Sequence, residues 1–219
     1  MTQGEPTYKR LIHHGAKALS LLFYPLLIPT YGMALYCLIM AEFLPVRYSV
    51  TVCLATLFFT CFIPVSLILF MWWKKQIPDL YIDDARLRTT PYLYSILGFG
   101  FWTWFVIRTM HAPLFLQYVS ASATAALVAV AFINLTWKIS AHLTAMGGLL
   151  GGICCFAYAT QTWPIGFIAA FLGLSLLLMV ARIEQKAHTP EQVVAGYLLG
   201  LATTTIPYFC ITLCLNSSL

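Results

Sequence analysis

Apolar runs of about 18 residues or more recur along nearly the whole chain, and this feature limits the fold more than any other. A helix of that length crosses a hydrocarbon core of roughly 30 Å, and inside lipid a helix satisfies its own backbone hydrogen bonds. We therefore expect an all-α, polytopic transmembrane helix bundle of about six to seven spans. The runs cover residues 18–40, 48–73, 92–110, 113–136, 142–160, 163–181 and 193–215.

The composition excludes an ordinary water-soluble domain. Of the 219 residues, 61% are hydrophobic and only 9% are charged, which leaves too little polar material to cover a soluble surface. We expect a single integral membrane domain over residues 1–219. The net charge of +5 is spread over loop ends, so no nucleic-acid partner is expected. All 7 cysteines fall in apolar runs and are expected to pack as small hydrophobes.

Two apolar runs carry residues that affect helix geometry. Pro25 and Pro29 lie in the first run, where the missing backbone donors predict a kink or a re-entrant segment. GGLLGG at residues 147–152 offers the small side chains that let two helices approach closely in lipid. We expect a tight helix contact there, and no phosphate-binding loop, because no strand precedes the glycines.

Polar residues gather in three segments at span boundaries, residues 74–92, 137–144 and 181–200. With seven crossings, these segments and the N-terminus would share one face of the membrane. An excess of Lys and Arg marks the cytoplasmic face of membrane proteins, so the charge count places this face in the cytoplasm. That face would hold Lys9, Arg10, Lys17, Lys74, Lys75, Arg86, Arg88, Lys138, Arg182 and Lys186, against Arg47 and Arg108 on the other.

Each polar segment also has a simpler interpretation. Arg86 and Arg88 could pair with neighbouring aspartates or bind lipid headgroups. Arg182 could extend its charge to the interface from a buried stem, and His142 could be an interfacial polar residue. The combination of two histidines, several bases and a serine on one face indicates a phosphate site with a nucleophile and a proton donor.

Together the three segments resemble the signature of the phosphatidic acid phosphatase type 2 superfamily of membrane lipid phosphatases. The resemblance covers residues 74–200. The third segment is similar to the family's Ser-Arg, five residues, His pattern, followed by a helix of small residues, VVAGYLLG. The matching positions are Arg88 with Pro91 for Arg-Pro, Ser140 with Ala141 and His142 for Ser-Gly-His, and Arg182 with His188.

The resemblance implies an integral membrane enzyme that hydrolyses a lipid phosphate or diphosphate. His188 would attack phosphorus and form a phosphohistidine, and His142 would protonate the leaving alkoxide. Arg88, Arg182 and Ser140, with Arg86 as a further candidate, would hold the phosphate oxygens. No metal or other cofactor is implied. The expected partners are a phosphorylated lipid substrate and the surrounding membrane lipids, and the expected location is a bacterial inner membrane.

The chain departs from the family pattern at three positions, and the smallest change is Ala141 in place of the glycine of the second motif. Tyr81 stands where the first motif has lysine; Arg86, Lys75 or Lys138 are the candidates to replace its charge. Gln192 stands where the third motif has an aspartate that orients the nucleophilic histidine. The histidine-orienting candidates are Gln192 itself and the nearby carboxylates Glu191 and Glu184, which are three and four residues from His188.

These departures leave alternatives open. A lipid-phosphate binding or transport protein with impaired catalysis would keep the anion site and tolerate the amide at position 192. A purely structural membrane protein would leave the three clusters unexplained. The membrane face of the site also stays open, because bacterial members of the family commonly act on the outer face, whereas the charge count favours the cytoplasm.

Overall fold

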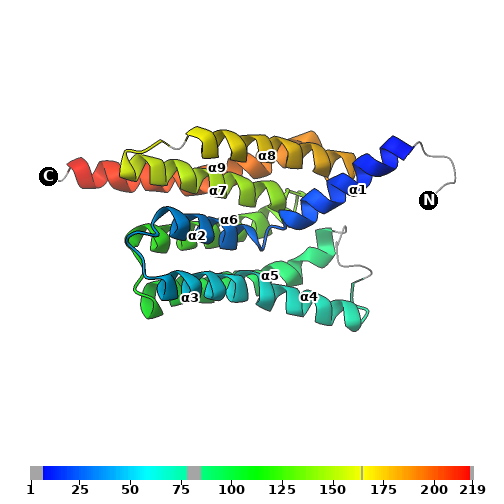
Figure 1. Cartoon of the computed structure of the whole chain (residues 1–219). Helices are drawn as coiled ribbons and strands as arrows, with labels where there is room; N and C mark the ends of the chain where they lie inside the picture. The colour runs from blue at the N-terminus through cyan, green and yellow to red at the C-terminus, as the bar shows by residue number, and fades with distance from the viewer. Residues whose placement is uncertain (1–6, 78–84, 164, 218–219) are drawn as a thin grey trace.

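The computed structural model describes residues 7–77, 85–163 and 165–217, and in this part of the chain every regular element is a helix (Figure 1). The elements are α1 (Thr7–Leu22), α2 (Ile28–Ile39), α3 (Val46–Leu57), η1 (Phe58–Phe62), α4 (Ile63–Trp73), η2 (Ala85–Arg88), α5 (Thr89–Trp104), η3 (Phe105–Thr109), α6 (Leu114–Asn134), α7 (Ala141–Thr160), α8 (Ile165–Glu184) and α9 (Pro190–Ser217). The all-α fold expected from the sequence is confirmed.

Five of the described helices are long and apolar enough to cross a membrane. Large apolar side chains stay exposed along their outer faces, such as Leu54 on α3 and Leu176 on α8. Such apolar faces suit contact with lipid, because their exposure to water would be unfavourable. The five are Val46–Trp73, which joins α3, η1 and α4, then Leu114–Asn134, Ala141–Thr160, Ile165–Glu184 and Pro190–Cys214.

The first apolar run forms two helices where the sequence allowed one kinked span. The chain leaves helical geometry after α1 and resumes it at Ile28. Pro25 lies in the break, where it cannot donate a backbone hydrogen bond, and Pro29 lies in the first turn of α2, where proline is tolerated. α2 has 12 residues and is about 18 Å long, which is too short to cross the hydrocarbon core alone.

The long helix Val46–Trp73 contains a π-helical turn over Phe58–Phe62. Pro64 follows directly and has no N–H to offer the carbonyl of Thr60 four residues earlier. The local widening accommodates the missing bond without ending the helix. The Thr60 hydroxyl donates across to the carbonyl of Leu26, 3.1 Å away, and so ties this helix to the break before α2.

Glycines bring α7 and α9 into close contact. A Cβ atom at Gly196 would lie 2.6 Å from the carbonyl oxygen of Ser140, and one at Gly200 would collide with the backbone of Thr144. Gly147 of the GGLLGG stretch meets the α9 backbone in the same way, so the close helix contact predicted for this stretch is confirmed. The contact fixes the start of α7 beside the start of α9, which carry two of the three polar segments.

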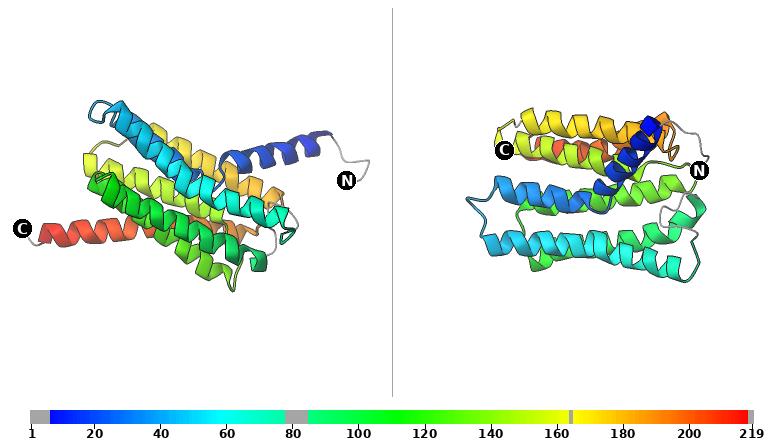
Figure 2. Two further views of the ribbon diagram at one scale, coloured as in Figure 1. Left: turned by 90° about the horizontal axis from the view of Figure 1, so that it is seen from below. Right: turned by 45° about the vertical axis from the view of Figure 1, so that its right-hand side comes forward.

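The helices run side by side and meet at a common end, seen at the right of Figure 1. The ends of α4, α6 and α8 and the starts of α5, α7 and α9 lie here; we call this the motif end. α1 reaches the motif end and projects beyond the bundle, whereas the C-terminal part of α9 projects from the opposite end (Figure 2). Segments far apart in sequence therefore converge at one end.

Candidate functional site

A cavity of about 450 Å³ lies at the motif end. Four predicted site residues line it, namely Arg88, His142, Arg182 and His188. They come from all three polar segments, since Arg182 and His188 share the third, and Ser20, Tyr24, Tyr92 and Ser95 also line the cavity. Among the described residues that line it there is no carboxylate. We call this cavity the polar chamber; its lining is cationic at one side and apolar elsewhere.

The turn after α8 places His188 beside Arg182. Lys186 adopts a left-handed conformation with a φ of 54°, while the N–H of Ala187 donates to the carbonyl of Arg182 at 3.2 Å and the N–H of Lys186 to that of Ile183 at 2.8 Å. This pattern is the Schellman ending of a helix. It reverses the chain at once, so both Arg182 and His188 are buried against the chamber, with 6% and 7% of their surfaces exposed.

His188 is oriented by Gln192. Its Nδ1 lies 3.1 Å from Oε1 of Gln192, and an amide oxygen only accepts, so Nδ1 carries the proton. The same Oε1 accepts the backbone N–H of Thr189 at 3.2 Å, while the N–H of Gln192 donates to Oγ1 of Thr189 at 3.4 Å. Thr189 and Gln192 thus form a capping box at the start of α9. This arrangement leaves Nε2 of His188 with a lone pair.

The chamber keeps the imidazole of His188 neutral. Burial lowers the pKa of His188 to about 3, and the nearby charges of Arg182, Arg88 and Lys138 also disfavour the protonated ring, while the hydrogen bond to Gln192 opposes the shift. A neutral imidazole with a free Nε2 is the form that can act as a nucleophile.

Gln185 connects Arg182 to α1. Nη1 of Arg182 donates to Oε1 of Gln185 at 3.2 Å. Nε2 of Gln185 donates in turn to the carbonyl of Ala16 at 2.7 Å and to Oγ of Ser20 at 2.9 Å. These bonds hold the end of α8 against α1 and fix the guanidinium at the chamber wall.

His142 lies in the first turn of α7 and also contacts the α1 end. Its Nε2 is 3.1 Å from the carbonyl oxygen of Ser20, so Nε2 carries a proton that it donates there. The ring of Tyr24 meets the imidazole edge-on, with 5.9 Å between ring centres. These contacts leave Nδ1 as the nitrogen that can exchange a second proton.

Arg88 is buried at the chamber, as Arg182 is, whereas Ser140 is placed differently from the prediction. Arg88 ends the turn η2 and leads into α5. Arg86 belongs to the same turn, and its side chain lies outside the described part of the structure, as do Asp83 and Asp84. Ser140 is fully buried and is not among the described residues of the chamber lining, so this arrangement does not present its hydroxyl to a phosphate.

Ser140 has a different position from the one expected of it. Its hydroxyl has no hydrogen-bond partner within the described residues. Its backbone N–H donates to the carbonyl of Gln192 at 3.3 Å, and its carbonyl faces Gly196. Ser140 therefore joins the second and third polar segments through the backbone.

Among the described candidates for the missing lysine and aspartate positions, one for each lies near His188; Arg86 is a further candidate whose side chain is not described. Glu184 and Glu191 are exposed, and the hydrogen bond of the His188 ring goes to Gln192 instead. Lys75 is exposed as well, whereas Lys138 is half-buried and lies close enough to His188 to affect its pKa. Gln192 and Lys138 are thus placed to serve the site.

Sequence reasoning missed three contributors to the chamber. The capping box could have been found, because Thr189, Pro190 and Gln192 fit the S/T-x-x-E/Q pattern with proline at the first helical position. Gln185 and Ser20 give no such signal. Their roles depend on the packing of α1 against α8, which brings together two residues that are 165 positions apart in the chain.

No protein-family model, curated protein or solved structure matches this chain. Any role for the polar chamber must therefore be inferred from its own residues and their geometry.

Proposed function

We propose that this chain is an integral membrane phosphatase, of six to seven spans in a bacterial inner membrane, that acts on a lipid phosphate or diphosphate through a phosphohistidine. The observation that carries the proposal is the convergence of two buried guanidinium groups and two imidazoles on one chamber whose described lining has no carboxylate. The membership in the phosphatidic acid phosphatase type 2 superfamily is part of the same proposal.

A phosphate group suits this chamber because its oxygens accept strong, charge-assisted hydrogen bonds from guanidinium groups. Arg88 and Arg182 offer paired N–H donors at fixed geometry, which match the oxygens of a tetrahedral dianion. Lys138 adds a further positive charge near His188. Charge neutralisation and positioning supply most of the catalysis in phosphoryl transfer.

The first chemical step uses the free nitrogen of His188. Its Nε2 lone pair attacks phosphorus, and the bond from phosphorus to the lipid oxygen breaks. The leaving alkoxide takes a proton from Nδ1 of His142, which becomes an imidazolium only once the bound phosphate dianion offsets the positive charges of Arg88 and Arg182. As His188 gains positive charge, the carbonyl oxygen of the Gln192 amide accepts the Nδ1 proton in a strengthened hydrogen bond.

The second step releases phosphate. Neutral His142 takes a proton from water, and the water oxygen attacks the phosphorus of the phosphohistidine. The P–N bond breaks, and its electron pair returns to Nε2 of His188. The products are inorganic phosphate and the dephosphorylated lipid, and both histidines return to their starting protonation states.

A second candidate function is binding or transport of lipid phosphates without turnover. The neutral amide of Gln192 favours it, because a carboxylate at that position would stabilise the imidazolium that forms during attack. In serine proteases, replacing the analogous aspartate by an amide costs about 10⁴-fold in turnover. The anion-binding residues of the chamber are equally compatible with this function.

Phosphate release separates the two functions. The purified protein in detergent should release inorganic phosphate from a panel of lipid phosphates and diphosphates, and His188→Ala should abolish the release. His111→Ala is the matched control, because His111 is exposed and lies between η3 and α6, at the end of the bundle opposite the motif end. Acid-labile radioactive phosphate retained on the wild-type chain, and absent from His188→Ala, would identify the intermediate. Tight lipid phosphate binding with no release would favour the binding function.

A further inference from the structure

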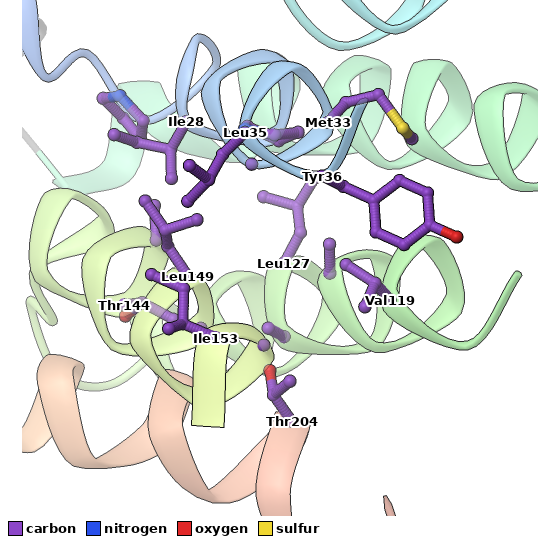
Figure 3. Close-up of a pocket in the computed structure, with 18 of the residues that line it drawn as sticks. Ile28, Met33, Leu35, Tyr36, Val119, Leu127, Thr144, Leu149, Ile153 and Thr204 are labelled. Carbon is purple, nitrogen blue, oxygen red and sulfur yellow. The ribbon is translucent and has the colours of Figure 1, made fainter. Parts of the chain in front are cut away.

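A second cavity, of about 150 Å³, runs between α2, α6 and α7 (Figure 3). The side chains of Leu35 from α2, Leu127 from α6 and Leu149 from α7 point into it. Along α7 its lining extends from Ala141 to Phe156, which corresponds to about 22 Å at the rise of an α-helix. We call it the apolar cavity. It is long, and it is narrower than the polar chamber.

The apolar cavity adjoins the polar chamber. Four residues line both, namely Pro25, Leu26, Leu127 and Ala141. Pro25 and Leu26 belong to the break between α1 and α2, and Ala141 precedes the chamber residue His142. A molecule whose charged end occupies the chamber can therefore place an apolar part directly in the cavity.

The threonine hydroxyls of the cavity lining are already hydrogen-bonded to backbone carbonyls and add little polarity to the cavity. The hydroxyl of Thr144 donates to the carbonyl of Ser140 at 3.0 Å, and that of Thr204 donates to the carbonyl of Gly200 at 3.1 Å. Both hydroxyls are thereby satisfied within their own helices. The remaining lining is almost entirely aliphatic and aromatic, so the cavity suits a hydrocarbon better than water.

An aromatic cluster lies at the end of the cavity away from the chamber. Tyr36, Phe115 and Phe156 all line the cavity and pack on one another, with ring centres 5.3 to 5.8 Å apart. They stand near the end of α2, the start of α6 and the end of α7, opposite the motif end. The cluster therefore stands close to the far end of the cavity, where α2 also contributes Ile39.

Resting on the proposed function, we propose that the apolar cavity binds one hydrocarbon tail of the phosphorylated lipid whose head occupies the polar chamber, and that the cluster of Tyr36, Phe115 and Phe156 sets the tail length. The lining spans about 22 Å, more than half of a hydrocarbon core of roughly 30 Å, so the site selects a long tail. Alkyl and isoprenoid tails share this chemistry, and substrates of each kind distinguish them.

Gly152 allows a direct test. It is buried and lines the cavity, yet a Cβ atom built on it meets nothing within 4 Å, so a side chain added there would enter the empty space. Gly152→Leu should block the cavity partway along its length. Gly173→Leu is the matched control, because Gly173 is on the exposed face of α8 and also has open space around it.

The experiment measures kcat/KM for alkyl monophosphates from hexyl to octadecyl and for prenyl monophosphates of increasing length. Gly152→Leu should lower kcat/KM for the long tails by about tenfold or more and leave hexyl phosphate within about twofold of wild type. Phe156→Ala should move the preferred length upward, and Gly173→Leu should keep the wild-type profile. A Gly152→Leu profile that matches wild type at every length overturns the tail site.

A binding readout keeps this test separate from the test of catalysis. An octadecyl phosphate with a photoreactive group near the chain end should crosslink to peptides of α2 and α7 in wild type and lose that crosslink in Gly152→Leu. If wild type hydrolyses none of the substrates but crosslinks this way, the proposed function fails and the tail site stands. Hydrolysis with crosslinks confined to the outer faces of the helices overturns the tail site alone.

Discussion

The Nδ1 atom of His188 lies 3.1 Å from the side-chain oxygen of Gln192, and that oxygen also accepts the backbone N–H of Thr189. One amide therefore caps helix α9 and fixes the tautomer of the candidate nucleophile. The orientation of the ring is built into the start of a helix, which is a rigid part of the fold. Orientation is preserved without a carboxylate, but the charge that would stabilise an imidazolium is not.

Gln192→Glu should raise activity and move its pH dependence. Glutamate at the third helical position keeps the capping box, and its carboxylate beside Nδ1 raises the pKa of His188 from its depressed value of about 3. Each unit of increase corresponds to about tenfold in the stability of the imidazolium. A pH profile of kcat/KM should show a higher plateau and an acid limb at higher pH, because more His188 becomes protonated as the pH falls.

Gln192→Leu provides the comparison for this prediction. It removes the acceptor for both the ring and the cap, so activity should fall and α9 should lose stability by about 1 kcal/mol. Ionisation of the substrate affects wild type, Gln192→Glu and Gln192→Leu equally. Differences between their pH profiles of kcat/KM therefore come from the proteins. A Gln192→Glu profile identical to wild type would show that the ring is not the titrating group in the rate-limiting step.

Arg182→Lys should lower kcat/KM by about 10²-fold while the protein still folds. Lysine keeps the charge but loses the planar pair of donors that matches phosphate oxygens, and it cannot reproduce the bond to Gln185 in the same geometry. Steady-state kinetics on a lipid phosphate measures the effect. Arg47→Lys, at an exposed position at the opposite end of the bundle, should leave kcat/KM unchanged. Equal losses in both variants would contradict a specific role.

Gly196→Ala should destabilise the bundle by about 1–3 kcal/mol and reduce activity with it. The new methyl group would lie 2.6 Å from the carbonyl oxygen of Ser140, which is backbone and cannot move without shifting α7 against α9. Thermal unfolding in detergent tests the prediction, with Gly173→Ala as the control because nothing lies within 4 Å of its added methyl group. An unchanged unfolding midpoint for Gly196→Ala would show that α7 and α9 can separate freely.

The sequence predicted the long helices well, because an apolar run with no proline in its interior has few other ways to satisfy its backbone in lipid. The run at 113–136 became Leu114–Asn134, and the run at 142–160 became Ala141–Thr160. The first run was less predictable. Pro25 permits either a kink or a break, and the break depends on contacts such as that of Thr60 with Leu26, 34 residues away.

The lining of the chamber was predictable from the motif order only in part. Arg88, His142, Arg182 and His188 were expected at one face and do line one cavity. The position of the Ser140 hydroxyl was not predictable, because a one-residue rotation at a helix start decides whether a side chain faces a cavity or a neighbouring helix. The contribution of Gln185 arises from tertiary packing against α1, and no local pattern encodes that packing.

The position of α1 bears on which membrane face carries the chamber. Gln185 holds Ala16 and Ser20 of α1 at the motif end, so the basic residues of α1 and those of the chamber belong to the same end of the bundle. A re-entrant first run would put the N-terminus and the motifs on opposite faces, and this finding goes against that arrangement. Arg47 and Arg108 are the basic residues near the other end. The excess of Lys and Arg predicts that the motif end faces the cytoplasm.

Single cysteines in a background without native cysteine test this prediction. Thr136 and Lys186 are exposed at the motif end, and Thr162 is exposed at the opposite end. In intact cells a membrane-impermeant maleimide should label Thr162→Cys and spare Thr136→Cys and Lys186→Cys, which should react only after the membrane is opened. Labelling of Thr136→Cys and Lys186→Cys in intact cells would place the chamber on the outer face and contradict the orientation predicted from the excess of Lys and Arg. Opposite results for Thr136→Cys and Lys186→Cys would contradict the bundle itself, because both flank the same chamber.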